Sequence, residues 1–353
     1  MVNKVIEENN ISTNLGSGKA FSIANNSNIL DILSNKLYEN PIEAIVREIF
    51  SNAIDANIEN KTSGGIEVVL PNNKNMIFQV KDHGIGMDND KIMNVYCEYG
   101  NSTKSNSNDQ IGGFGIGCKT PFAYTDTFML ESIKNGVKNS YVIYKTDADR
   151  QINLVSSEPS EGHGTTVTVP VKDNDGNRFI RAALKVFLFA KEFPTMDTDS
   201  LSAFEYCLKN HYGIEREKYD NVRKQIQDNN EVIEGLNVSS EGLYINIGGV
   251  CYSINKDNFR GYRSILNDTY NNMIVLNADV GELSVQASRE KLNYDKNTIE
   301  IIRRKIKEFI ASTVKNIENV LNDNSKTFLE RVKVLDMYNL DNLEYMENCF
   351  GEY

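Results

Sequence analysis

A glycine-rich segment in the first third of the chain could bind phosphate through its backbone. The segment reads IGGFGIGCKTPF and carries glycines at positions 112, 113, 115 and 117. Glycine lets a backbone turn so that several N–H groups point at phosphate oxygens, and Lys119 adds a positive charge nearby. The loop is neither a GxxxxGK[ST] motif nor a GxGxxG motif after a first strand, so by itself it is a weak indication of function.

A second motif, VKDHGIGMD, places an acidic residue at the end of a predicted strand. Asp82 is followed by Gly84 and Gly86, which would let the backbone pass closely under a flat ligand. The same D-x-G-x-G pattern also fits a tight turn. Alone, this motif leaves both interpretations open.

Residues 41–60 are predicted to form a helix that carries a third polar group. Pro41 suits a first helical turn, and the apolar residues after it recur at the spacing of one buried stripe. Glu48, Asn52 and Asp55 follow one another at helical spacing and form a polar stripe beside the buried one. A solvated helix face is the ordinary explanation of such a stripe. The two glycine motifs that follow favour a ligand site instead.

Short β-rich runs after this helix predict a sheet. The expected strands lie in GIEVVL, MIFQVK, TFMLES, SYVIYK and GTTVTVPV. The fold class predicted for the chain is α+β, and its first domain is expected to be an α/β sandwich with a largely antiparallel sheet. The polar segment KDNDGN is expected to separate this domain, 1–172, from a second domain, 177–353.

The second domain is predicted to mix helices and strands. It should begin with the helix RFIRAALKVFLFAKEF, which stops near Pro194. Strands are expected in LYINIGGVCYSI and MIVLNA, and the C-terminal part should be helical from TIEIIRRKIKEF onward.

Composition fits a globular protein and narrows its partners. A chain of 353 residues exceeds the roughly 250 residues at which single cores stop growing, so two domains are expected. The net charge of -11 disfavours broad attraction to nucleic acid, although local basic patches stay open. The cysteines form no CxxC pair and the histidines show no metal spacing, so neither disulfides nor structural zinc are predicted. With no apolar run for a membrane span or signal peptide, a cytoplasmic protein is the default expectation.

Taken in order, four segments resemble the signature of the GHKL, or Bergerat-fold, ATPases. They are REIFSNAIDA, DHGIGMD, IGGFGIGCKTPF and GHGTTVTV, and they span about residues 40 to 170. The family includes DNA gyrase, the ninety-kilodalton heat-shock chaperone, histidine kinases and the mismatch-repair protein MutL. The resemblance implies a sandwich whose mixed sheet carries helices on one face, with ATP and Mg²⁺ as cofactors and ATP hydrolysis as the activity.

The resemblance assigns a role to each matching position. Glu48 would be the general base that deprotonates the attacking water, and Asn52 would hold Mg²⁺ through its amide oxygen. Asp82, backed by Thr165, would accept the amino hydrogens of adenine, because a carboxylate accepts hydrogen bonds and does not donate them. Asp55 would brace the pocket. The other predicted nucleotide contacts are Gly84, Gly86, Gly112, Gly113, Phe114, Gly115, Ile116, Gly117 and Lys119.

The polar segment YGNSTKSNSNDQ stands where the family has its ATP lid. Asn101, Ser102 and Lys104 are candidate phosphate contacts within it. Ordinary loop chemistry explains these residue types equally well, so both interpretations stay open.

The second half of the chain resembles the chaperone's middle domain at VGELSVQASREKLNYDKN. The resemblance implies a ribosomal-protein-S5-domain-2-like fold with C-terminal helices. Arg289 would reach the γ-phosphate across the domain boundary and stabilise charge in the transition state. Asn293 stands where the chaperone has a glutamine, and would be a polar assistant. Without the resemblance, Arg289 would be taken for a surface arginine at the start of a helix.

The segment GGFGIGCKTPFAYTDTF is more similar still to the rIIA-like proteins of phages, which carry a chaperone-like ATPase and middle domain. This resemblance predicts an ATP-driven conformational switch that acts on an unidentified protein partner. It leaves open an ATP-dependent homodimer, and it places the protein in the cytoplasm of a bacterial host.

Two other functions compete with this prediction. One is a DNA clamp of the MutL or topoisomerase kind; the acidic charge and the SREKL segment favour the switch over it. The other is a module that binds nucleotide without turnover, against which Glu48 and Arg289 argue. Histidine kinase activity is disfavoured because no histidine lies in a suitable helix before the ATPase segment.

Overall fold

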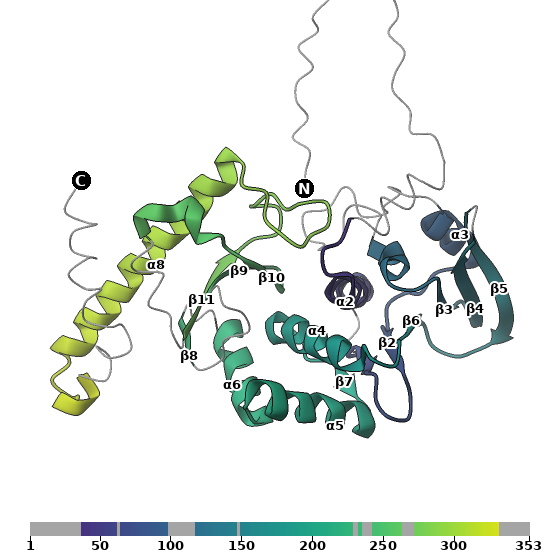
Figure 1. The fold of residues 1–353 in the computed structure, drawn as a ribbon, viewed down its shortest axis with the longest axis horizontal. Coiled ribbons are helices and arrows are strands. Elements are labelled where there is room, and N and C mark those ends of the chain that lie inside the picture. The colour runs from purple at the N-terminus through teal and green to yellow at the C-terminus, as the bar shows by residue number, and fades with distance from the viewer. Residues whose placement is uncertain are drawn as a thin grey trace, which may run out of the picture. The chain divides into compact units, whose positions relative to one another are not determined.

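The computed structural model describes residues 37–61, 64–97, 117–146, 149–228, 232–234, 242–262 and 272–331 (Figure 1). Its contacts divide the chain into two compact units. The first comprises Met1–Phe187, Glu192–His211 and Ala287–Glu290, and the second comprises Leu188–Lys191, Tyr212–Gln286 and Lys291–Tyr353. None of the helices in the described ranges is long and apolar enough to cross a bilayer.

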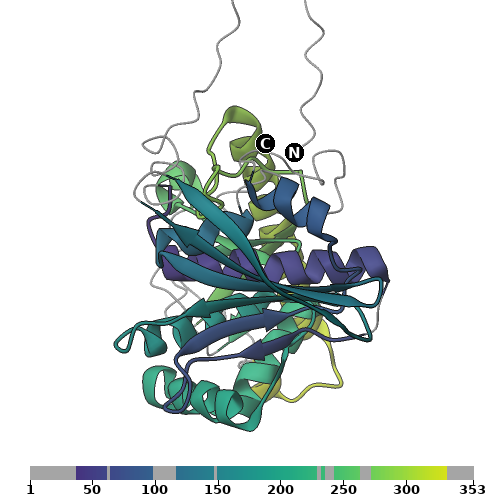
Figure 2. The same ribbon diagram turned by 90° about the vertical axis from the view of Figure 1, so that its right-hand side faces the viewer.

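Helix α2, Pro41–Asn60, is the central helix of the first unit and confirms the predicted helix. Asn40 caps its start by accepting a hydrogen bond from the Glu43 backbone N–H, and Lys61 ends it in the left-handed conformation. The helix packs on strands β2 and β6, as Figure 2 also shows. Its buried apolar residues are Ile42, Ala44, Ile45, Val46, Ile49, Phe50 and Ala53.

The first unit contains a mixed sheet of seven strands in the order β5-β4-β3-β6-β2-β1-β7. Its neighbouring strands are antiparallel except β1 and β7, which run parallel, so the predicted largely antiparallel sheet is confirmed. The strands are β1 (Glu67–Val69), β2 (Ile77–Lys81), β3 (Thr127–Lys134), β4 (Val137–Lys145), β5 (Arg150–Pro159), β6 (Gly164–Pro170) and β7 (Thr195–Met196).

Two helical segments complete the nucleotide-signature part of this unit. Helix α3 spans Asn89–Cys97, and the 3₁₀ segment η1 spans Gly117–Ala123 directly after the glycine loop. The Asn89 side chain accepts a hydrogen bond from the Tyr141 hydroxyl at 3.1 Å, which ties α3 to β4. Helix α2 packs directly on η1.

The first unit extends past the boundary expected between residues 172 and 177. Helix α4 (Gly176–Phe189) packs Phe179 against Phe78 of β2 and Phe187 against Phe50 of α2 as tilted ring pairs, with centroids 5.7 and 4.8 Å apart. Helix α5 (Thr198–Cys207) and the π turn η2 (Leu208–Tyr212) follow β7. These aromatic contacts and the β1–β7 pairing hold the segment to the sheet. Whether residues 1–172 form a domain by themselves stays a prediction.

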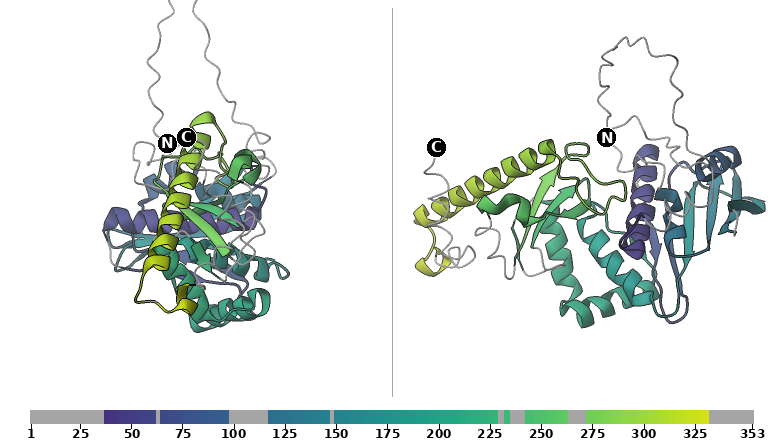
Figure 3. Two further views of the ribbon diagram at one scale, coloured as in Figure 1. Left: turned by 90° about the vertical axis from the view of Figure 1, so that its left-hand side faces the viewer. Right: turned by 45° about the horizontal axis from the view of Figure 1, so that its top comes forward.

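The second unit contains a sheet of four strands in the order β10-β9-β11-β8, in which β9 and β11 are parallel. Its strands are β8 (Val232–Glu234), β9 (Leu243–Ile247), β10 (Val250–Ser253) and β11 (Asn272–Ala278), and its helical segments are α6 (Arg216–Gln227), η3 (Lys256–Tyr262) and α8 (Lys296–Asn322). Asp295 caps the long helix α8, which Figure 3 shows in yellow-green. The strands predicted in this half and the C-terminal helix are confirmed, and the likeness to the chaperone's middle domain stays a prediction.

Several elements were not predicted from the sequence. Strand β5 lies at the edge of the large sheet with most of its side chains exposed, so it lacks the alternation that marks a half-buried strand. Helices α5 and α6 lie in a stretch rich in charge, where few apolar residues outline a buried stripe.

Candidate active site

Glu48, Asn52 and Gly117 lie together where α2 packs on the start of η1. The Glu48 side chain is buried, with 4% of its surface exposed, and Asn52 is half-buried. A Cβ atom at Gly117 would lie 2.6 Å from Glu48 Oε2 and 3.7 Å from Asn52 Nδ2. Any larger residue at position 117 would therefore fill the space beside the carboxylate. The structure thus brings the helix motif and the last glycine of the glycine loop into contact.

The Glu48 carboxylate is held by two buried arginines. Arg289 Nη1 donates to Oε2 at 2.9 Å, and Arg47 Nε lies 3.4 Å from Oε1. Arg289 is only 6% exposed, so the interpretation of this residue as a surface arginine is wrong. Arg47 could not be singled out from the sequence, because adjacent residues of a helix generally point in different directions. In the sequence, its position directly before Glu48 in the REIF segment was what pointed to the site.

Arg289 belongs to a short segment, Ser288–Glu290, that forms hydrogen bonds with the N-terminal half of α2 and the residues just before it, within the first unit. Arg47 Nη2 donates to the Ser288 carbonyl oxygen at 2.9 Å. The two carboxylate oxygens of Glu290 accept hydrogen bonds from the backbone N–H groups of Glu39 and Asn40, both at 2.8 Å. We call Ser288–Glu290 the clasp. The contacts thus group Ala287–Glu290 with the first unit, although Gln286 before it and Lys291 after it belong to the second.

The backbone of Arg289 has a φ of 56°, in the left-handed region that L-residues other than glycine seldom adopt. Such a conformation costs about 1–2 kcal/mol and persists only when neighbouring contacts hold it. The hydrogen bonds of Ser288 and Glu290 flank it on both sides. The clasp therefore aims the guanidinium at Glu48 at a conformational cost.

Asp82 and Thr165 lie together at the end of β2, as the resemblance implied. Asp82 is 7% exposed, and its backbone N–H donates to the Thr165 carbonyl oxygen at 2.9 Å. Its Oδ1 accepts hydrogen bonds from the backbone N–H groups of Gly84, at 2.9 Å, and of Thr165, at 3.0 Å. The orientation of the carboxylate is therefore fixed by backbone donors. A carboxylate held in this way can only accept hydrogen bonds.

Gly84 and Gly86 are required by contacts within the protein. A Cβ atom at Gly84 would lie 2.7 Å from the Ala56 Cβ, because the loop after β2 packs directly on α2. Gly86 has a φ of 63°, and a Cβ there would overlap the Ile133 carbonyl oxygen. The expected reason for these glycines was room for a flat ligand. The described contacts give them a different reason, close packing on α2 and β3.

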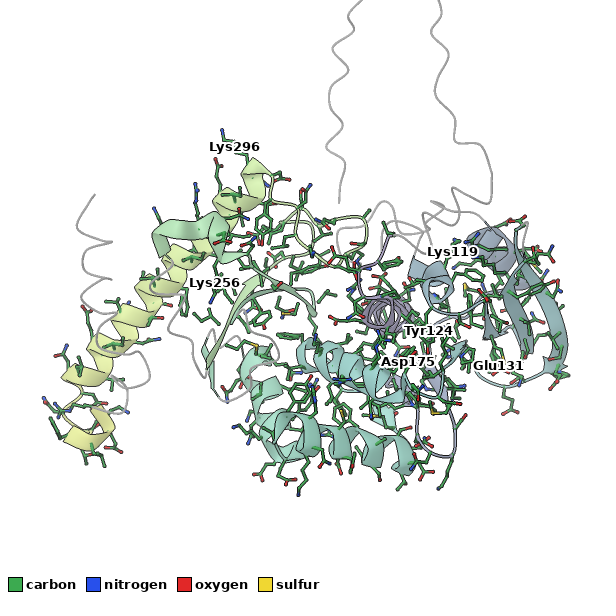
Figure 4. All side chains as sticks on the ribbon, in the orientation of Figure 1. Lys119, Tyr124, Glu131, Asp175, Lys256 and Lys296 are labelled. Carbon is green, nitrogen blue, oxygen red and sulfur yellow. The ribbon has the colours of Figure 1, made fainter. Side chains whose placement is uncertain are left out.

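Lys119 lies in η1 and is labelled in Figure 4. It is 2% exposed, and its Nζ lies 3.5 Å from Cys118 Sγ. Burial raises the pKa of the Cys118 thiol, with the neighbouring lysine acting in the opposite direction. The contact with phosphate that the sequence assigns to Lys119 stays a prediction.

Several predicted site residues lie outside the described residues or outside the first unit. Asn293 belongs to the second unit, where its backbone N–H donates to the Ser284 carbonyl oxygen at 2.8 Å. No group of three His, Cys, Asp or Glu side chains suited to a metal ion occurs in the described ranges. The residues outside the described ranges are Asn101, Ser102, Lys104, Gly112, Gly113, Phe114, Gly115 and Ile116.

A family model matches part of the chain. Residues 38–174 match the model of the family described as histidine kinase-, DNA gyrase B-, and HSP90-like ATPase. No curated protein matches the chain. The matched segment contains Glu48, Asn52, Asp82, Gly117 and Thr165. The match supports an ATP-binding domain of the GHKL superfamily over residues 38–174.

Proposed function

We propose that the protein hydrolyses ATP with Mg²⁺ and uses the cycle as a conformational switch on a partner protein. The observation that carries this proposal is the buried Glu48 carboxylate, which lies beside Asn52 and Gly117 and pairs with Arg289. A general base, an amide oxygen and an arginine are the groups that ATP hydrolysis needs. A module that binds nucleotide without turnover needs no general base beside its phosphate site.

Asp82 recognises the base in this proposal. Two backbone N–H groups fix its Oδ1, so the carboxylate has one orientation toward the ligand. It accepts hydrogen bonds without donating them, which matches the amino group of adenine and repels the carbonyl edge of guanine. Thr165, whose backbone forms hydrogen bonds with Asp82, would support the adenine site next to this carboxylate.

Asn52 is the residue that would hold Mg²⁺. Its half-buried amide offers an oxygen ligand, and the lack of a side chain at Gly117 lets the backbone at the end of the glycine loop approach the amide closely. A single protein ligand suits Mg²⁺, which keeps most of its waters and takes further oxygens from the phosphates. When bound, the ion would neutralise negative charge on the phosphate oxygens.

Glu48 would remove the proton from the attacking water. As the water oxygen bonds to the γ-phosphorus, the bond to the β-phosphate oxygen breaks, ADP leaves and the water proton passes to the carboxylate. In the described arrangement Arg289 occupies Oε2. Hydrolysis therefore requires the guanidinium to shift from the carboxylate toward the phosphates, where its charge stabilises the transition state.

Calorimetry tests nucleotide binding directly. With Mg²⁺ present, a nonhydrolysable ATP analogue should bind the full chain and the matching GTP analogue should bind at least tenfold more weakly. Phosphate release from ATP should then be measured in the wild type and in Arg304→Ala, which removes an exposed arginine paired with Glu282 in the second unit. Equal turnover in these two proteins is expected. Absence of analogue binding, or equal affinity for both bases, would refute the proposal.

The partner, the assembly and the branch of the family belong to the same proposal. An rIIA-like, chaperone-type switch in a bacterial cytoplasm would act on a protein, and nucleotide could drive formation of a homodimer. Light scattering with and without the ATP analogue measures that dimer. The net charge of -11 argues against the DNA clamp, which would instead show DNA binding that falls steeply with added salt.

A further inference from the structure

Asp82, His83 and Gly84, which we call the base loop, are held by side chains from the last turns of α2. Asn57 Oδ1 accepts a hydrogen bond from the His83 backbone N–H at 2.8 Å. Its Nδ2 donates to the Gly64 carbonyl oxygen at 2.8 Å, and the side chain is only 6% exposed. Both the oxygen and the nitrogen of the Asn57 amide therefore form hydrogen bonds, and the oxygen bonds to His83, the residue directly after Asp82.

Other side chains hold the rest of the base loop. Asn60 Nδ2 donates to the His83 carbonyl oxygen at 3.0 Å. His163 Nδ1 lies 2.7 Å from the Gly84 carbonyl oxygen, and because a carbonyl only accepts, this nitrogen must carry the proton. Gly84 also packs against Ala56, whose Cβ leaves no room for a side chain. The backbone after Asp82 is thus fixed from α2 and from the turn before β6.

These contacts orient the Asp82 carboxylate, and none of the side chains that make them has to touch the ligand. Asp82 Oδ1 takes its position from the N–H groups of Gly84 and Thr165. If the His83 N–H lost its acceptor, the base loop could shift and carry the Gly84 N–H with it. A carboxylate misplaced by a fraction of an ångström makes a poorer hydrogen bond to its ligand.

We infer that Asn57 is a positioning residue for adenine recognition, which acts on Asp82 through the backbone of His83. This inference rests on the proposed function. The same helix carries Glu48 and Asn52 near its middle and Asn57 in its last turn. Helix α2 therefore sets the distance between the residues that act on the phosphates and the loop that recognises the base. Loss of Asn57 should therefore weaken nucleotide binding and leave the chemical step intact.

The test compares Asn57→Ala with Asn57→Asp and with a matched control. Asn246→Ala is that control, because Asn246 also uses both ends of its amide, on the Gly249 N–H and on Asn277 Oδ1, in the second unit. Asn57→Ala should raise the Kd for the ATP analogue and the KM for ATP by about tenfold, with kcat changed by less than about twofold. Its preference for ADP over GDP should fall by a similar factor. Asn57→Asp retains the acceptor for His83 and should recover part of the affinity.

Three outcomes would overturn the inference. They are an unchanged Kd in Asn57→Ala with only a lower melting temperature, a fall in kcat at unchanged Kd, and an equal loss of affinity in Asn246→Ala. If the wild type itself fails to bind the ATP analogue, the proposed function is what fails. The melting temperature of each variant distinguishes loss of folded protein from loss of base recognition.

Discussion

Arg289 donates a hydrogen bond to the Glu48 carboxylate at 2.9 Å, and both side chains are almost fully buried. Removing one partner of a buried ion pair leaves the other uncompensated, which typically costs about 3–5 kcal/mol. Alanine substitutions at either position would therefore mix a catalytic effect with a loss of stability. Substitutions that keep the hydrogen bond or the volume, each measured together with its melting temperature, separate the two effects.

Glu48→Gln should abolish most ATP hydrolysis and keep nucleotide affinity within several-fold of the wild type. The amide oxygen can still accept the hydrogen bond from Arg289, but the amide cannot take a proton from water. Calorimetry with the ATP analogue and single-turnover phosphate release measure the two effects. Turnover near the wild-type rate would reject Glu48 as the base.

Arg289→Met should slow hydrolysis by about 10³-fold or more and leave ADP affinity nearly unchanged, on the scale seen when arginine fingers are removed. Methionine fills much of the volume of the side chain without its charge. Arg289→Lys, which keeps a single positive charge, is the control and should lose less activity. An ADP affinity that falls as much as the rate would show that Arg289 supports the pocket instead of the chemical step.

The sequence predicted those parts of the fold that repeat at a regular spacing. Ile302, Ile306 and Ile310 of α8 recur every four residues on one buried face, and α2 carries a similar stripe. Periodicity of this kind fixes the type and approximate length of an element. The polar residues Glu48 and Asn52, four apart on α2, were correctly placed side by side for the same reason.

Contacts between distant segments could not be predicted in this way. Ser288 of the clasp lies 241 residues after Arg47 in sequence. Neither the clasp nor the length of the first unit has a local signal, because both depend on contacts between segments that lie far apart in sequence. The resemblance pointed to Arg289 but implied a contact with phosphate, and the pairing with Glu48 came from the structure.

Asp82→Asn should fold normally and lose nucleotide binding. The Asn side-chain oxygen can accept the same two hydrogen bonds from the Gly84 and Thr165 backbone N–H groups that Asp82 Oδ1 accepts. Its NH₂ group would then face the amino group of adenine, donor against donor. Calorimetry with the ATP analogue should show no binding at a melting temperature close to that of the wild type. Unchanged affinity would mean that the base lies elsewhere.

Asp175 should contribute stability that disappears in acid. Figure 4 labels Asp175 and Tyr124, and the Asp175 carboxylate accepts hydrogen bonds from the Tyr124 hydroxyl at 2.9 Å and from Arg178 Nη1 at 2.8 Å. Burial alone would raise the pKa of Asp175, but these hydrogen bonds and the positive charges of Arg178 and Lys172 outweigh it and lower the pKa below the usual 3.8. A lowered pKa stabilises the folded state above pH 3.8, and this contribution is lost as the pH falls through the folded-state value.

Asp175→Asn should therefore lower the urea midpoint of unfolding near pH 6, and this effect should become smaller when the midpoint is measured at a pH below the usual pKa of 3.8. Asp173→Asn, at an exposed site two positions earlier, is the matched control and should change the midpoint little at either pH. A loss of stability that is the same at both pH values would contradict the assigned role of the Asp175 charge.

Glu290→Ala should release the start of α2 and disturb the aim of Arg289. The Glu290 carboxylate accepts hydrogen bonds from the backbone N–H groups of Glu39 and Asn40, which precede the first turn of the helix. Without these acceptors both amides should exchange with deuterium faster, and hydrolysis should slow because the left-handed backbone of Arg289 loses the contacts that flank it on one side. Glu308→Ala removes an exposed glutamate of α8 and should leave both amides unchanged. Wild-type exchange at Glu39 and Asn40 in Glu290→Ala would show that the clasp is held by Ser288 and Arg289 alone.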